Sequence, residues 1–273
     1  MSLMVCRQEP VKNPYYIEAL GVRIWSSAEL CYVIYHNPLF VMDGFVDEHL
    51  IAFIREELDM EGLSSKLEKW MSGKGDGDSL LFLILSECGY YSLAEQNKFR
   101  QEVAAFRKLP PAEYARQKGD DLFLRKQYGK AASVYEKILN LPKGGGVTDE
   151  LLEKVWCSLG CTQARMFQFQ KAWYSFEKAY NCRKSEEVLK RMYYLSRTGE
   201  GMGGRNHHLP FVGEEQKAQW EKDIAEAGER AKTSEGVLKL EGLFEQEEEK
   251  RRADAAVEEI EKLRRQLEEL QKQ

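Results

Sequence analysis

Residues Tyr128–Lys137, which read YGKAASVYEK, return 41 positions later as FQKAWYSFEK at Phe169–Lys178. Both copies hold Lys-Ala at the third and fourth positions and an aromatic residue followed by Glu-Lys at the end. Gly119 returns as Gly160 in the same alignment, which needs no gaps. A fixed offset of this length indicates helical hairpins that stack, because a single hairpin cannot bury its own apolar face. The sequence therefore predicts a mainly α fold organised around residues 114–180.

The repeated pattern resembles the tetratricopeptide repeat (TPR). In the second copy, the residues at the family's Trp, Leu-Gly, Ala, aromatic and Ala positions are Trp156, Leu159-Gly160, Ala172, Phe176 and Ala179. The first copy retains Gly119, Ala131, Tyr135 and a closing Pro142, with Ala115 and Ile138 at two divergent positions. The repeat period of 41 residues exceeds the usual ~34 because a Gly-rich loop and an extra helical turn lie between the two copies. The resemblance implies two αα hairpins in a right-handed superhelix, capped by a helix that begins after Ser185.

The resemblance also implies a binding groove. In TPR proteins the first helix of each hairpin lines the concave surface, and mixed charge over an apolar floor suits a peptide or helix ligand. The matching positions here are Glu113, Arg116, Asp120, Phe123, Lys154, Cys161, Ala164 and Arg165. The carboxylate clamp of chaperone-binding members needs Lys and Asn at set places. Asp120 and Ser158 replace the Asn residues, which argues against recognition of a chaperone's acidic C-terminus.

Composition and spacing divide the chain into four segments. Residues 1–108 form an α-rich N-terminal domain, in which Tyr15–Ile17 and Val22–Trp25 around Gly21 predict one small β-hairpin. Two helices broken near Gly62 are expected between residues 46 and 71. Residues 109–198 hold the repeats with the capping helix, and residues 199–213 are a Gly-rich linker. Residues 214–273 form a charged helical tail.

The tail contains a short heptad-like seam. Its apolar residues recur at intervals of three and four, at Ala253, Ala256, Ile260, Leu263, Leu267 and Leu270. Such a seam could pair with a second copy in a homodimer, dock on the body of the protein, or remain a single helix supported by Glu and Lys pairs.

Bulk composition narrows the function classes. The chain is 43% hydrophobic and 31% charged, as expected of a soluble and mainly helical protein. Its net charge of -5 gives no basic footprint for nucleic acid, and its longest apolar run, Leu80–Leu85, is far shorter than the ~20 residues that span a bilayer. Six scattered cysteines and an N-terminus without a signal peptide favour reduced thiols in the cytoplasm.

Candidate chemical motifs have simpler interpretations. Cys157 and Cys161 share a helix face, but two thiols are too few for a zinc site, and we interpret them as small core residues. The pair His207-His208 and the glycines of 199–204 lie in the linker, where a phosphate-binding strand-to-helix turn is not expected. The sequence thus predicts no catalytic residue, cofactor or metal.

The leading hypothesis is a non-enzymatic adaptor or scaffold that binds a protein or peptide partner in the TPR-like groove. A second hypothesis makes the N-terminal domain a small enzyme or ligand-binding domain that the repeats position, based on the aromatic residues of 15–35. A third makes the protein a dimerising coiled coil through its tail.

Overall fold

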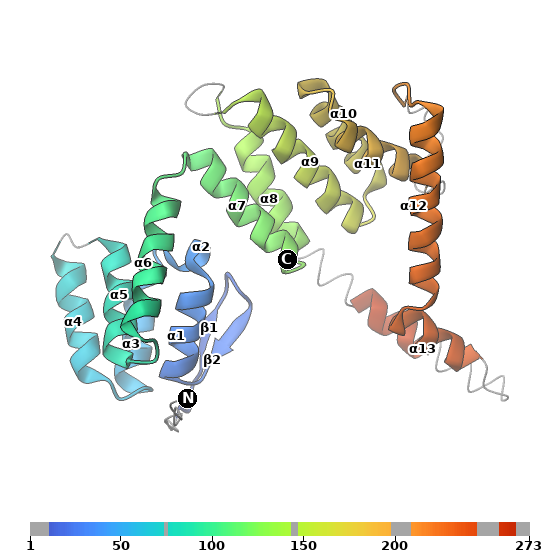
Figure 1. Ribbon diagram of the computed structural model, residues 1–273. Coiled ribbons are helices and arrows are strands. Elements are labelled where there is room, and N and C mark those ends of the chain that lie inside the picture. Colours follow the sequence, from blue (N-terminus) through green and yellow to red (C-terminus); the bar gives the residue numbers. More distant parts are fainter. Residues whose placement is uncertain (1–10, 74–75, 143–146, 198–208, 245–256, 266–273) are drawn as a thin grey trace. The chain divides into compact units, whose positions relative to one another are not determined.

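The computed structural model describes residues 11–73, 76–142, 147–197, 209–244 and 257–265 (Figure 1). Most of these residues are helical, and the described strands form one two-stranded antiparallel sheet. This confirms the predicted mainly α fold with one small β-hairpin. The chain divides into two compact units, Met1–Pro110 and Pro111–Gln273. Across the described residues, no helix combines the length and the apolar character that a membrane crossing requires.

The first unit begins with the β-hairpin. Strands β1 (Tyr15–Ile17) and β2 (Val22–Ile24) pair with Ile17 opposite Val22, and Gly21 adopts the positive φ of 69° that glycine tolerates best. The helices that follow are α1 (Ser27–His36), α2 (Pro38–Val41), α3 (Glu48–Glu56), α4 (Glu61–Ser72), α5 (Gly77–Cys88) and α6 (Leu93–Arg107).

The helix break in this unit lies earlier than the predicted position near Gly62. The backbone N–H groups of Glu57 and Leu58 both donate to the carbonyl of Phe53, and Asp59 adopts a left-handed φ of 53°. Aspartate is among the residues that adopt this conformation most readily, and Asp59 lies between the end of α3 at Glu56 and the start of α4 at Glu61. Gly62 lies instead in the first turn of α4.

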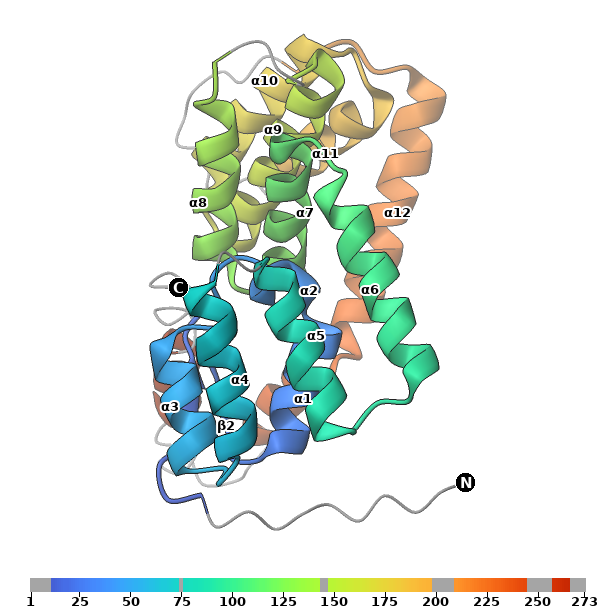
Figure 2. The same cartoon turned by 90° about the vertical axis from the view of Figure 1, so that its left-hand side faces the viewer.

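The second unit contains two hairpins with the same turn geometry. The first joins α7 (Pro111–Leu124) to α8 (Tyr128–Leu139), and the second joins α9 (Asp149–Arg165) to α10 (Phe169–Cys182). Lys126 and Phe167, which are 41 residues apart, have φ values of 62° and 58°. The next residue of each turn donates its backbone N–H to the fifth residue before it, over 2.9 Å in both cases. The sequence repeat is therefore also a structural repeat, and both views show α7 to α10 as successive helices (Figure 1, Figure 2).

The two repeated glycines explain how closely the helices of each hairpin approach. A Cβ atom placed on Gly119 would lie 2.6 Å from a ring carbon of Tyr135, and one placed on Gly160 would lie 2.6 Å from the matching ring carbon of Phe176. Both distances are shorter than van der Waals contact. The hydrogen of glycine is what lets each aromatic ring lie against the facing helix.

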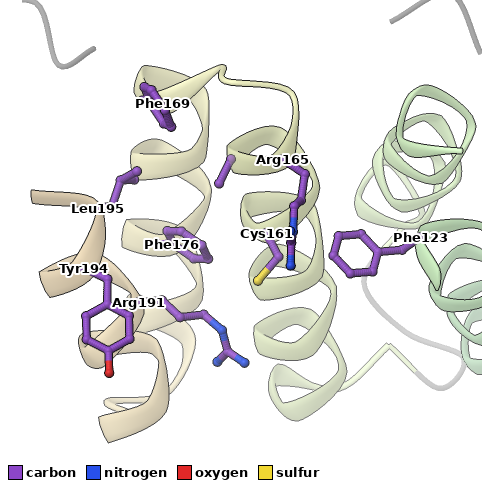
Figure 3. Close-up of a pocket in the computed structure, with 9 residues that line it drawn as sticks. Phe123, Cys161, Arg165, Phe169, Phe176, Arg191, Tyr194 and Leu195 are labelled. Carbon is purple, nitrogen blue, oxygen red and sulfur yellow. The ribbon is translucent and has the colours of Figure 1, made fainter. Parts of the chain in front are cut away.

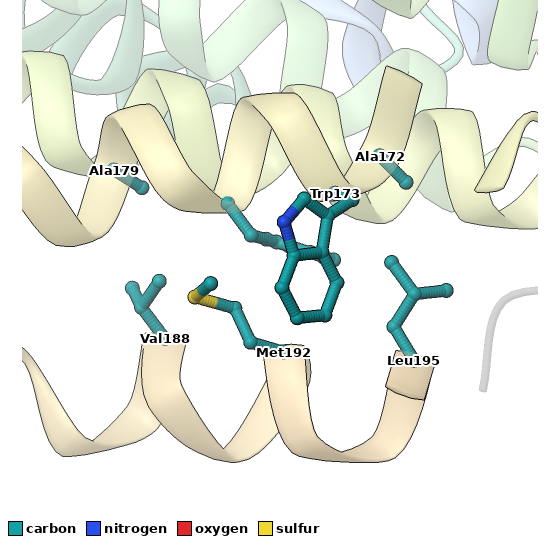
Figure 4. Packing of buried hydrophobic residues seen from close by; sticks show 7 residues of the cluster. Ala172, Trp173, Ala179, Val188, Met192 and Leu195 are labelled. Atoms are coloured by element: carbon teal, nitrogen blue, oxygen red, sulfur yellow. The ribbon is translucent and has the colours of Figure 1, made fainter. Parts of the chain in front are cut away.

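Helix α11 (Glu186–Ser196) packs on the second hairpin. Trp173 of α10 projects between the two helices toward Met192 and Leu195 of α11, and all three side chains are buried (Figure 4). The apolar residues of α11 recur at helical spacing, so that one face meets α10. This is the layer that the sequence predicted after Ser185.

A further helix covers α11, so α11 is not the last layer of the described stack. Trp220 of α12 (Glu214–Lys232) is only 3% exposed and packs with Leu189 and Tyr193 on α11. The Tyr193 hydroxyl donates to Glu221 over 2.5 Å, and Lys190 forms an ion pair with Asp223 at 2.7 Å. The first part of the charged tail therefore docks on the repeats. The three arrangements left open for the seam at residues 253–270 concern a later part of the tail.

The rest of the predicted tail is described in part. Helix α13 (Glu235–Phe244) follows α12, and residues 257–265 are helical, with Ile260 and Leu263 nearly half exposed. The linker residues 199–208, with His207-His208, lie outside the described residues, as do four of the six seam positions: Ala253, Ala256, Leu267 and Leu270.

Candidate binding groove

Two adjoining hollows lie along the inner face of the stack. They share Phe123 of α7, Cys161 of α9 and Arg191 of α11, so we treat them as one groove. The apolar hollow has a volume of about 340 Å³ and is lined by Phe123, Cys161, Ala164, Arg165, Phe169, Phe176, Arg191, Tyr194 and Leu195 (Figure 3). The second hollow, which we call the polar hollow for the Asp120, Ser158 and Arg191 side chains in its otherwise mostly apolar wall, has a volume of about 310 Å³. It is lined by Asp120, Phe123, Leu124, Tyr135, Cys157, Ser158, Cys161 and Arg191.

Helical spacing places these side chains on one surface. Cys157, Cys161, Ala164 and Arg165 follow one another at intervals of four, three and one in α9, which keeps them on neighbouring rows of the same helix face. Asp120, Phe123 and Leu124 have the equivalent relation in α7. The groove is thus built mainly from the first helix of each hairpin, and α11 supplies its far wall. The second helices add Tyr135 of α8 and Phe169 and Phe176 of α10.

The structure brings five of the eight predicted groove residues to the hollows. These five are Asp120, Phe123, Cys161, Ala164 and Arg165. The other three, Glu113, Arg116 and Lys154, do not line either hollow.

Arg116 is occupied by contacts within its own helix. Its guanidinium donates to Glu113, with Nη2 at 2.6 Å from Oε1 and Nε at 3.1 Å from Oε2, and it also forms an ion pair with Asp120. These bonds lower the pKa of the Glu113 carboxyl and raise that of the Arg116 guanidinium. The ladder of three charged side chains stiffens the inner face of α7. A partner would have to break it before Arg116 could bind anything else.

Lys154 lies on the exposed side of α9. Its Nζ donates to Glu150 over 2.8 Å, one helical turn earlier, in a pair where both side chains are more than half exposed. Such pairs add little to stability. Lys154 therefore contributes general surface charge rather than a wall of the groove.

The Asp120 carboxylate is held by three neighbours. The Tyr135 hydroxyl donates to its Oδ1 over 2.6 Å, Ser158 donates to the same oxygen over 3.4 Å, and Arg116 pairs with its other oxygen. An acidic side chain at this position repels an incoming carboxylate. This geometry agrees with the departure from the carboxylate clamp that the sequence shows.

The two arginines of the apolar hollow differ in their partners. Arg191 of α11 donates to Glu187 over 2.8 Å, and it is about one-third exposed. Arg165 is exposed at the end of α9, and no carboxylate among the described residues pairs with it. The apolar hollow therefore presents at least one cationic group beside its aromatic walls.

Sequence reasoning missed the contribution of α11 to the groove. Arg191, Tyr194 and Leu195 lie on its inner face, at intervals of three and one that the sequence already shows. This spacing indicated one face of a helix, but the resemblance predicted that the helix would cap the stack rather than line the groove. Cys157 and Cys161, interpreted from the sequence as small core residues, do pack against the hydrophobic core, but both are only partly buried and also line the polar hollow.

A third hollow lies between α8, α9 and α10. It is larger, at about 550 Å³, but polar and charged side chains such as Glu136, Gln163, Gln170 and Lys171 make up much of its wall. Sites that hold a ligand tightly are usually mostly apolar, with a few polar groups that fix orientation. The groove with the apolar hollow fits that description better.

No grouping of three or more His, Cys, Asp or Glu side chains within the described ranges could hold a metal ion. In comparisons with known proteins, no family model, curated protein or solved structure matches the chain.

Proposed function

We propose that this protein is a non-enzymatic adaptor that binds a peptide or short helix of a partner protein in the groove between α7, α9 and α11. The observation that carries the proposal is the apolar hollow, where Phe123, Phe169 and Tyr194 surround a cavity with Arg165 at its rim. Aromatic side chains and arginine are the residues most enriched at the centres of protein interfaces.

The size of the apolar hollow indicates what it holds. A cavity of about 340 Å³ accommodates one or two apolar side chains of a partner, rather than a long segment. Arg165 at its edge favours a carboxylate or backbone carbonyl next to that apolar anchor. We therefore expect a segment in which a bulky apolar residue is followed closely by an acidic one, with modest affinity.

The experiment compares the partners that two variants of the full chain capture. Phe123→Ala with Arg165→Ala removes an aromatic wall and the rim charge, and leaves the Arg116 ladder intact. Gln170→Ala with Lys171→Ala is the matched control, because both residues are exposed on α10 and line the third hollow.

We expect the groove variant to lose partners that the unaltered chain and the control variant both retain, as identified by mass spectrometry. Equal recovery by all three proteins, with helical content unchanged by circular dichroism, would refute the proposal. The N-terminal enzyme hypothesis and the coiled-coil hypothesis stay predictions, and neither gains a specific observation from the described residues.

A further inference from the structure

Cys157 and Cys161 form a close pair of thiols in an accessible part of the groove. They are one helical turn apart on α9, where side chains at this spacing are neighbours. Both are partly exposed and both line the polar hollow, and Cys161 also lines the apolar hollow. A small molecule that enters either hollow can therefore reach the Cys161 sulfur.

Charged and polar groups from three other helices face this pair. Arg191 of α11, itself paired with Glu187, extends toward α9 (Figure 3), and its charge acts on both Cys157 and Cys161. Arg165 of α9 adds a second positive charge. On the opposite side of the polar hollow lie Asp120 of α7, whose carboxylate is bound by Arg116, and the Tyr135 hydroxyl of α8.

These surroundings separate the acidities of the two thiols. The neighbouring Cys157 thiol and the charges of Arg191 and Arg165 together outweigh burial and lower the pKa of the Cys161 thiol. The interaction with Cys161, together with burial, raises the pKa of the Cys157 thiol. Cys161 is therefore the more acidic of the two thiols, and it is also the one that lines both hollows.

We propose that Cys161 and Cys157 are a peroxide-reactive thiol pair, in which Cys161 is the nucleophile and Cys157 is the resolving thiol. The Cys161 thiolate attacks one oxygen of hydrogen peroxide, the O–O bond breaks, and hydroxide leaves to give a sulfenic acid. The Cys157 sulfur then attacks the Cys161 sulfur, loses its proton, and displaces the sulfenic hydroxyl as water. Overall, two thiols are oxidised to one disulfide, and peroxide is reduced to two waters.

Formation of the disulfide would change the groove. Helix neighbours four residues apart have Cβ atoms about 5–6 Å apart, whereas a disulfide needs about 3.5–4.5 Å. The turn of α9 between Cys157 and Cys161 must therefore tighten, which moves a wall shared by the two hollows. A bond under such strain is also easily reduced, as suits a reversible modification.

The lowered pKa sets the direction of the expected reactivity difference. Near neutral pH a larger share of such a thiol is present as the thiolate, which is the reactive form. Each thiolate becomes less nucleophilic as its pKa falls, so the gain in rate is smaller than the gain in ionised fraction, and it increases as the pH falls.

The first test uses the unaltered full chain, so it does not depend on the folding of any variant. The rate of alkylation by iodoacetamide is measured at each cysteine by peptide mapping, with the partly buried Cys88 and Cys182 as internal references. We expect Cys161 to react faster than either reference at pH 7, and the ratio of its rate to theirs to increase at pH 6. A Cys161 that reacts no faster than both references would overturn the proposal.

The second test separates the roles of the two thiols. Treated with dilute hydrogen peroxide, the unaltered chain is expected to lose two hydrogen atoms and give a peptide with Cys157 joined to Cys161. In Cys157→Ser the sulfenic acid should persist and be trapped on Cys161 by dimedone. Oxidation that begins at another cysteine, or a Cys161 that joins a cysteine other than Cys157, would contradict the assignment.

Arg191 variants test the contribution of its charge to the nucleophile. Arg191→Gln removes the charge and is expected to slow alkylation of Cys161 and raise the pH at which its rate is half-maximal, whereas Arg191→Lys retains the charge and should restore most of the rate. Equal rates in both variants, with unchanged circular dichroism, would exclude this role of Arg191. These outcomes do not depend on the proposed peptide ligand.

Discussion

The hairpins α7/α8 and α9/α10 share a backbone but differ in the chemistry of their inner faces. Asp120 and Tyr135 in the first hairpin correspond to Cys161 and Phe176 in the second, 41 residues later. In the first hairpin the Tyr135 hydroxyl donates to Asp120 over 2.6 Å, and Arg116 completes an ionic ladder. In the second, a thiol and an unsubstituted ring occupy the same two places and line the apolar hollow.

This difference shows how two copies of one repeat can carry different chemistry on the same face. The polar groups of the first hairpin bind one another, so its inner face offers a partner the Phe123 ring and few free hydrogen-bonding groups. The second hairpin leaves a thiol, an aromatic ring and nearby arginines around an open cavity. Small changes at equivalent positions, rather than a change of backbone, therefore place the binding surface on one side of the stack.

The largest expected effect tests the part that the hairpins share. Gly119→Ala and Gly160→Ala should each lower the free energy of unfolding by about 1–2 kcal/mol, because overpacking at a 2.6 Å contact outweighs the better helix propensity of alanine. Urea denaturation monitored by circular dichroism measures the free energy of unfolding of both variants.

The matched control for these glycines is Gly228→Ala in α12, where an added methyl group would meet no atom within 4 Å. This variant should be neutral or stabilising by up to about 1 kcal/mol. If Gly119→Ala and Gly160→Ala behaved like Gly228→Ala, the close approach would not be a shared requirement of the two hairpins.

An effect of similar size, but limited to one hairpin, is expected from making the first hairpin resemble the second. Tyr135→Phe removes the hydroxyl that donates to Asp120, and should lower the free energy of unfolding by about 1.5 kcal/mol, the value of a hydrogen bond to a charged group. Asp120 retains its ion pair with Arg116, so the loss should not be larger. Thermal unfolding compares this variant with Tyr128→Phe, whose residue lies near the start of α8. If both variants lowered the unfolding temperature equally, the effect would come from the loss of any tyrosine hydroxyl rather than from the bond to Asp120.

The smallest expected effect is a pH dependence of the first hairpin. Hydrogen bonds from Arg116 lower the pKa of Glu113 in the folded protein, so its contribution is complete above the unfolded pKa of about 4.3 and is lost as the pH falls through the lower folded pKa. The stability difference between the unaltered chain and Glu113→Gln should therefore narrow as the pH falls below about 4.

Urea titrations of both proteins from neutral to acid pH measure that difference. Glu177→Gln, at an exposed position on α10, provides the comparison. A Glu113→Gln difference that stays constant over the whole range would mean that the ladder adds nothing specific to the first hairpin.

Sequence periodicity was sufficient to predict the helices and the hairpin repeat. Gly119 and Gly160, with Tyr135 and Phe176, sit at a constant offset because each pair meets within one hairpin, and such local contacts leave a regular pattern in the sequence. The spacing of three and four on α7 and α9 likewise brought five of the eight predicted side chains to the groove. The β-hairpin followed from aromatic and β-branched residues around Gly21.

Only the tertiary structure decided how α11 and α12 complete the stack. Trp220 packs on α11 across a segment of more than twenty residues, and Arg191 reaches the hollows from a helix outside the repeat, so neither contact follows from local periodicity. Whether Arg116 is free or bound depends on side-chain geometry that spacing alone does not determine. The sequence by itself determined the helices and their hairpins, because those arise from contacts between near neighbours. The wall that α11 adds to the groove and the cover that α12 adds to α11 arise from contacts between distant residues, which only folding brings together.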